Sequence, residues 1–133
     1  MILTGGWKNL KNEEKLVIEG ELPGLNEIIE NSKTHWAKYA EEKKSLTETV
    51  AWLAKEQIKN KYSKIDLTFI WFCKNKRRDK DNIIAGQKFV IDGLVEAGVI
   101  ENDGWEQIGN ISHFFSIDKE NPRVEVIIGG RRK

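Results

Sequence analysis

The chain has 133 residues, of which 39% are hydrophobic and 32% are charged, and its formal net charge is +1. This length predicts a single domain over residues 1–133. The small net charge means that any binding to a polyanion has to rest on local patches. The single cysteine, Cys73, excludes an intramolecular disulfide and a cysteine-based zinc site.

No segment is apolar over the length that crosses a membrane. The first residues, Met1 to Trp7, lack the basic and apolar regions of a signal peptide. We therefore expect a cytoplasmic protein with no membrane contact.

The first half of the chain predicts a strand, a helical region and a second strand. β-Branched residues indicate a strand over 15–21, which ends at Pro23-Gly24. Apolar residues at helical spacing follow over 26–58, in one or two helices. Residues 64–73 are β-branched and aromatic with little polar interruption, which is typical of a strand buried on both faces.

The second half predicts a helix over 81–97, ended by Gly98, and a β-hairpin. The hairpin strands are residues 107–117 and 123–128, and residues 118–122 supply the turn. This order of elements predicts an α+β domain with a small mixed β-sheet and helices packed against it.

Cations and aspartates are clustered directly after the second strand. The cations of this basic run are Lys74, Lys76, Arg77, Arg78 and Lys80. Asp79 and Asp81 flank Lys80, and Asp103 follows the helix in an acidic turn. Cations attract phosphates, and spaced carboxylates suit Mg²⁺. The combination predicts metal-assisted cleavage of a phosphodiester, provided that the chain reversal after the helix brings Asp103 towards the other two aspartates.

The predicted helix has a polar strip that includes Asp81, Ala85, Lys88 and Asp92. On this strip Lys88 would face the same phosphate as Asp81. Each residue also has a plainer interpretation. Lys88 and Asp92 form an i,i+4 surface pair, Asp81 is a helix N-cap, and Asp103-Gly104 is a turn.

Other site motifs are absent. The sequence from Asp79 begins like a calcium loop but has Ile84 and Val90 where glycine and glutamate are needed. There is no glycine-rich phosphate loop or dinucleotide fingerprint, so no organic cofactor is expected. His35 and His113 are isolated from other candidate residues, which favours structural roles.

The segment RRDKDNIIAGQKFVIDGLVEAGVIENDGW, residues 77–105, resembles the RusA-type Holliday junction resolvases, and most of all those of phages and prophages of Gram-positive bacteria. The resemblance implies a RusA-like fold and a homodimeric endonuclease that uses Mg²⁺, or Mn²⁺ in its place, in DNA recombination and repair. The family's essential acidic residues fall on Asp79, Asp81 and Asp103, and its lysine on Lys88. That lysine comes about one helical turn later here than in the family prototype.

The sequence therefore predicts a structure-selective endodeoxyribonuclease that resolves four-way junctions and other branched DNA. Asp79, Asp81 and Asp103 would bind the metal, Lys88 would contact the scissile phosphate, and the basic run would hold flanking phosphates. Two alternatives stay open. One is a non-catalytic module that binds branched DNA, and the other is a cation-stabilised structural protein.

Overall fold

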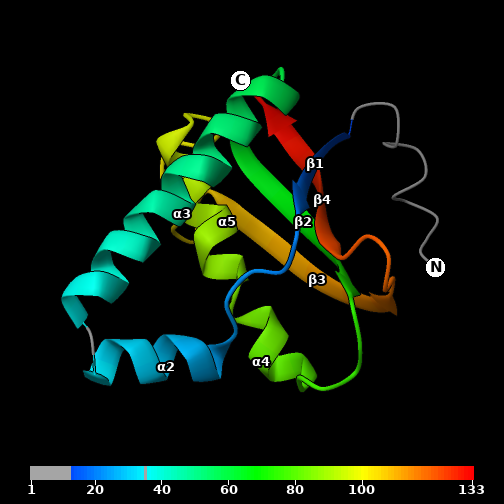
Figure 1. Cartoon of the computed structure of the whole chain (residues 1–133). Helices are drawn as coiled ribbons and strands as arrows, with labels where there is room; N and C mark the ends of the chain where they lie inside the picture. Colours follow the sequence, from blue (N-terminus) through cyan, green and yellow to red (C-terminus); the bar gives the residue numbers. More distant parts are fainter. Residues whose placement is uncertain (1–12, 35) are drawn as a thin grey trace.

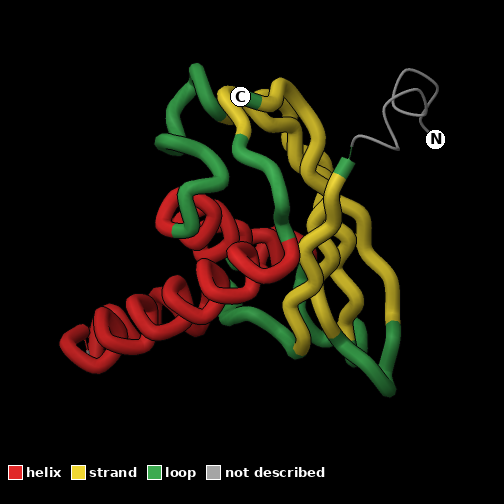
Figure 2. Tube along the Cα trace, turned by 90° about the horizontal axis from the view of Figure 1, so that it is seen from above, coloured by secondary structure: helices red, strands yellow, loops and turns green. Residues whose placement is uncertain are grey.

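A mixed β-sheet carries all the described helices on one of its faces (Figures 1 and 2). The computed structural model describes residues 13–34 and 36–133. The predictions made for Met1 to Trp7 and for His35 lie outside these residues. The described strands are β1 (Glu14–Glu19), β2 (Tyr62–Cys73), β3 (Ile108–Ile117) and β4 (Arg123–Arg132). The described helices are α2 (Leu25–Thr34), α3 (Trp36–Gln57), α4 (Lys80–Ile84) and α5 (Gln87–Glu96).

The predicted α+β class and the mixed sheet are confirmed, and the order of strands across the sheet is β1-β4-β2-β3. β2 is antiparallel to β4 on one side and parallel to β3 on the other. The predicted hairpin between β3 and β4 is therefore wrong, because β2 lies between them. The Asp118 N–H donates to the Cys73 carbonyl at 2.8 Å, which holds the start of the connecting turn against the end of β2.

The core lies between the sheet and the helices. Its buried members on the sheet and on α3 and α5 include Leu16, Ile18, Ile65, Leu67, Phe69, Trp71, Val124, Val126, Ile128, Val50, Ala54, Val90 and Leu94. Along β2 the buried residues alternate with exposed or half-buried ones such as Asp66 and Ile70. The expected burial of β2 on both faces is wrong, because the described helices all cover the same face (Figure 2).

The predicted continuous helix over 81–97 is wrong as well, because α4 and α5 are separate helices (Figure 1). At the break, Gly86 N donates to Ile83 O at 3.1 Å and Phe89 N donates to Gly86 O at 3.2 Å. These are the short i→i+3 bonds of a tightened turn. A Cβ on Gly86 would stand 3.0 Å from Leu22 and 3.3 Å from the Trp71 ring, so only glycine fits here comfortably. Asp81 and Lys88 therefore belong to different helices.

Cys73 is buried and unpaired, and burial raises the pKa of its thiol, as expected of an inert cysteine. None of the described helices has both the length and the apolar character needed to cross a membrane.

His113 on β3 joins the edge strand to the core. Its Nδ1 accepts a hydrogen bond from Trp71 Nε1 at 2.9 Å, and its ring stacks on Phe69 with centroids 5.1 Å apart. Burial lowers the pKa of His113, so the neutral ring is the form that the fold favours.

We expect His113 to make the protein less stable below neutral pH. The folded pKa lies below the unfolded value of about 6.5, so the unfolded chain binds the proton more readily. The stability that neutral His113 contributes is present above about pH 6.5 and is lost as the pH falls through the folded pKa. The melting temperature of the wild type should fall more steeply between about pH 7.5 and 5.5 than that of His113→Gln. Parallel curves for the two proteins would contradict this role.

Candidate metal and nucleic-acid site

The candidate site begins where β2 ends and α4 starts. Asp79 occupies the N-cap position of α4, with φ −70° and ψ 155°, but its side chain makes no capping hydrogen bond. Asp81 lies in the first turn and its Oδ1 accepts from the Asn82 N–H at 2.9 Å. The plain interpretation of Asp81 as the N-cap is therefore wrong. Both aspartates are exposed, and neither carboxylate has an ion pair among the described residues.

Asn82 fixes α4 to the rest of the protein. Its side chain is 9% exposed, and its Oδ1 accepts from the Asn26 N–H at 2.8 Å, at the start of α2. The same amide fills the space beside Gly24, where a Cβ would stand 2.7 Å from it. The sequence alone did not single out Asn82 as a residue that positions α4. The signal that could have indicated this role is its polar side chain beside Ile83 and Ile84, where an apolar helix face was expected.

A surface hollow of about 670 Å³ holds the two aspartates together with part of the basic run. Its lining combines carboxylates, cations and apolar side chains, among them Asp79, Asp81, Lys76, Arg78, Lys80, Cys73, Ile83, Phe115 and Ile117. Lys80 Nζ stands 5.3 Å from the centre of the Phe115 ring, in a cation–π contact. Charges of both signs thus share one hollow with apolar side chains.

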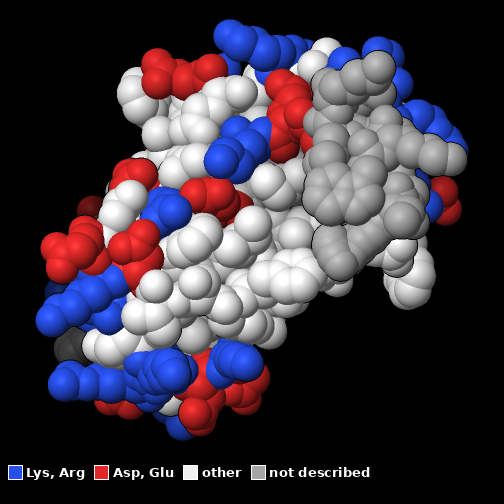
Figure 3. Space-filling model, turned by 90° about the vertical axis from the view of Figure 1, so that its right-hand side faces the viewer, with Lys and Arg blue, Asp and Glu red and all other residues white. Residues whose placement is uncertain are grey.

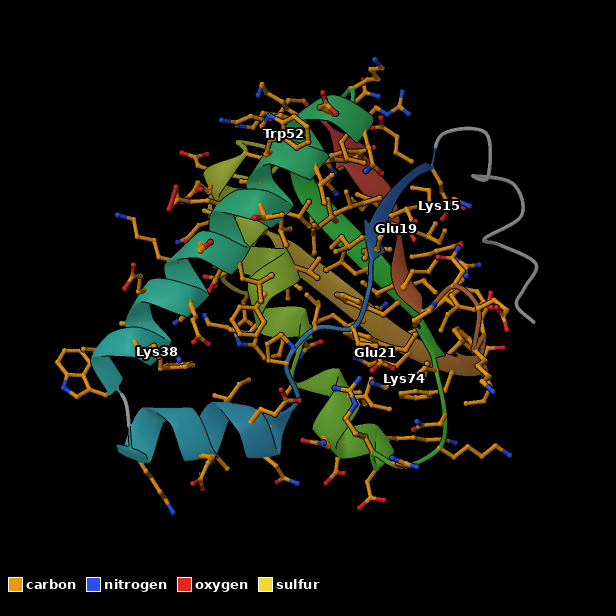
Figure 4. All side chains as sticks on the ribbon, in the orientation of Figure 1. Lys15, Glu19, Glu21, Lys38, Trp52 and Lys74 are labelled. Carbon is orange, nitrogen blue, oxygen red and sulfur yellow. The ribbon has the colours of Figure 1, made fainter. Side chains whose placement is uncertain are left out.

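The basic run divides into cations held by the protein and cations turned to solvent. Arg78 Nη1 donates to the Leu22 carbonyl at 3.0 Å, and its guanidinium lies within 4 Å of both Glu21 and Glu27. Lys74 Nζ is 3.9 Å from Glu21, and these two side chains lie close together in Figure 4. Lys76 and Arg77 are exposed, and no ion pair of either is found in the described part of the chain. Arg78 is therefore a structural residue before it is a phosphate ligand.

The Asp103 carboxylate lies beside the Lys88 ammonium. Lys88 Nζ lies 3.1 Å from Asp92 Oδ1 and 3.9 Å from Asp103 Oδ2, so it bridges α5 and the loop that leads to β3. Asp103 directly precedes a tight turn, in which the Gly104 carbonyl accepts from Gln107 N at 3.1 Å and Ile108 N at 2.9 Å. The plain interpretations of Lys88 as the partner of Asp92 and of Asp103-Gly104 as a turn signal thus both describe real contacts.

The fit of Mg²⁺ to these residues rests on Asp79 and Asp81. Mg²⁺ in proteins is usually held by one or two carboxylates together with substrate phosphates and waters. Asp79 and Asp81 are exposed and line one hollow with cations, so they supply the carboxylates of such a site. Residues 13–34 and 36–133 contain no group of three His, Cys, Asp or Glu side chains placed to hold a metal ion. The convergence of Asp79 and Asp81 with Asp103 stays a prediction.

Neither a scan of the chain against protein-family models nor a search of curated proteins finds a match. The residues and their geometry therefore carry the functional argument.

We expect Arg78 and Arg77 to differ in what they contribute to stability. Arg78→Ala removes a charged hydrogen bond to a backbone carbonyl and two ion pairs, and should lower the free energy of unfolding by about 1–3 kcal/mol. Arg77→Ala, its matched control, changes an exposed side chain and should stay within about 0.5 kcal/mol of the wild type. Urea unfolding of the two variants measures both values. Equal values would mean that Arg78 does not anchor the loop before α4.

Proposed function

We propose that the protein is a Mg²⁺-dependent endodeoxyribonuclease that cuts branched DNA, with four-way junctions as its main substrate. The observation that carries the proposal is the placement of Asp79 and Asp81 in one hollow with Lys76 and Lys80. A phosphodiester in this hollow would have cations for its charge and carboxylates for the metal on the same side. The resemblance of residues 77–105 to the RusA-type resolvases supports the choice of substrate.

The roles of Asp79, Asp81 and the basic run are proposed from their surroundings, and those of Asp103 and Lys88 from the resemblance to the RusA-type resolvases. Asp79 and Asp81 would hold the Mg²⁺, with Asp103 as the third carboxylate of the proposal. The metal, when bound, would activate a water and neutralise charge on the leaving oxygen. Flanking phosphates would be bound by Lys76, Arg77 and Lys80, and also by Lys74. Arg78 would mainly hold the loop that carries these side chains. Lys88 would place its ammonium near the phosphate charge that develops during the reaction.

We further propose that the protein acts as a homodimer in the cytoplasm. A four-way junction has two-fold symmetry, and its resolution needs two nicks at symmetric positions. Two sites related by a two-fold axis meet that need most simply.

A non-catalytic module that binds branched DNA is the main rival. The observation in its favour is that Lys88 already has two protein carboxylates as partners, Asp92 and Asp103. The two functions differ in one measurement, which is magnesium-dependent nicking of a synthetic four-way junction. A structural protein would instead show no salt-dependent DNA binding at all.

Asp81→Asn should separate cleavage from binding. The change keeps the size of the side chain and removes a charged metal ligand, so junction cleavage should fall by orders of magnitude. Binding should persist or tighten, because a negative charge near the phosphates is removed. Glu96→Gln on α5 is the matched control, since it removes one exposed carboxylate from the same part of the chain and should cut normally. Cleavage by Asp81→Asn at the control rate would remove Asp81 from the catalytic set.

Lys88→Ala should reduce single-turnover cleavage far more than junction binding, because the ammonium would act on charge that develops in the transition state. Lys88→Arg should rescue cleavage only in part, since a planar fork replaces a compact charge. If Lys88 is merely the surface partner of Asp92 and Asp103, Lys88→Ala will cut like the wild type and shift stability by about 0.2–1 kcal/mol. Single-turnover assays beside thermal melts distinguish the two outcomes.

A further inference from the structure

A second cationic surface lies at the opposite end of β2 from the candidate site. We call it the tail surface. Its members are exposed lysines and arginines that come from the end of the chain and from the residues around the start of β2: Lys59, Lys61, Lys64, Arg131, Arg132 and Lys133. The C-terminus lies at the top of Figure 1, and Lys and Arg side chains gather along the top edge of Figure 3.

The pairing between β2 and β4 brings the cations of the tail surface together, with a bulge in the register between Tyr62 and Lys64. Arg131 lies opposite Lys64 in the antiparallel register. The Ser63 hydroxyl donates to the Arg131 carbonyl at 3.2 Å, and the Lys133 N–H donates to the Lys61 carbonyl at 2.9 Å. The backbone positions of these cations are thus set by the sheet.

The charges of this surface are balanced by the protein only in part. The whole chain has a net charge of only +1, and six of its 22 lysines and arginines lie on this surface. Lys133 lies 3.7 Å from Glu101, but no ion pair of Lys59, Lys64 or Arg131 is found among the residues that the structure describes. Like charges directly opposite each other on paired strands are destabilising. A bound polyanion would relieve this repulsion between Lys64 and Arg131.

The Glu14 carboxylate, at the start of β1, is occupied by neutral donors. Glu14 accepts hydrogen bonds from Lys59 N at 2.6 Å, from the Asn60 backbone and side chain, and from the Tyr62 hydroxyl at 2.7 Å. These bonds tie the start of β1 to the start of β2. Glu14 therefore serves the fold, whereas Lys59, Lys64 and Arg131 are exposed and have no ion pair among the described residues.

We propose that the tail surface binds the phosphate backbone of a duplex DNA arm, about one helical turn away from Asp79 and Asp81. β2 has 12 residues, and the eleven steps between its first and last residue, at about 3.3 Å a step, span roughly 36 Å. One turn of B-DNA is about 34–36 Å long. The choice of branched DNA as the ligand rests on the proposed function, whereas the location of the surface rests on the geometry.

The test compares two double variants that each remove two positive charges. Lys64→Gln with Arg131→Gln alters the tail surface. Lys38→Gln with Lys44→Gln alters two exposed lysines of α3. Lys38, labelled in Figure 4, lies far from the C-terminus, which Figure 1 marks in the same orientation. Binding of both variants and the wild type to four-way junctions is measured by fluorescence anisotropy across a salt series, with Ca²⁺ replacing Mg²⁺. Junction arms of about 8 and about 20 base pairs are used, shorter and longer than one turn of about 10 base pairs.

On long arms, the tail-surface variant should bind on the order of tenfold more weakly than the wild type at 0.1 M salt, and its slope of log K against log salt should fall by about 1.8. On short arms, which do not reach the surface, it should bind like the wild type. The control variant should match the wild type on both. Equal binding by the two variants on long arms, or an equal loss on short and long arms, overturns the proposal. If the double variant unfolds in a circular dichroism melt, Lys59→Gln with Lys133→Gln replaces it with the same expectations.

The results of this test distinguish a failure of the tail-surface proposal from a failure of the proposed nuclease function. If the wild type shows no magnesium-dependent nicking but the arm-length effect is found, the duplex-binding surface stands and the catalytic proposal fails. If junctions are nicked normally and the tail-surface variant binds long arms like the control, the nuclease stands and this surface is rejected. A wild type that binds no DNA overturns both.

Discussion

The central position of β2 is the constraint on which the rest of the structure depends. It is the longest described strand and lies between β4 and β3, so both of its edges are paired and its inner face meets the helices. Because β3 runs parallel to β2, the chain has to return along the sheet before it enters β3, and α4 and α5 make that return. This topology puts Asp79 and Asp81 at one end of β2.

The loop and helix that carry these aspartates are held by polar contacts to the segment after β1. Asn82 accepts from the backbone at the start of α2, and Arg78 donates to the Leu22 carbonyl next to Glu21. A cation and an amide in the middle of the candidate motif thus stabilise the scaffold. The exposed members of the same motif are left available for a ligand. A rigid support of this kind is what a site needs when its reacting groups must keep their positions.

The charges of the protein are sorted along β2 although they almost cancel in total. One end has aspartates and lysines together in a hollow, and the other has cations set by the pairing of β2 with β4. Mixed charge suits a place where a metal and a phosphate meet, whereas cations alone suit a backbone that only has to be held. The proposed division into a cutting end and a holding end follows from this sorting.

The sequence by itself determined the class of fold, most strand and helix positions, and the composition of the candidate motif, because these depend on local periodicity and residue type. It failed where the outcome depended on distant partners. Gly86 lies at the break between α4 and α5, where a Cβ would crowd Leu22 and Trp71. β3 does not pair with β4, because β2 occupies the position between them. Likewise, only the tertiary structure showed that Arg78 is bound by Glu21 and Leu22, and that Asp103 contacts Lys88. Packing and pairing between segments far apart in the chain decide such contacts, and no local pattern encodes them.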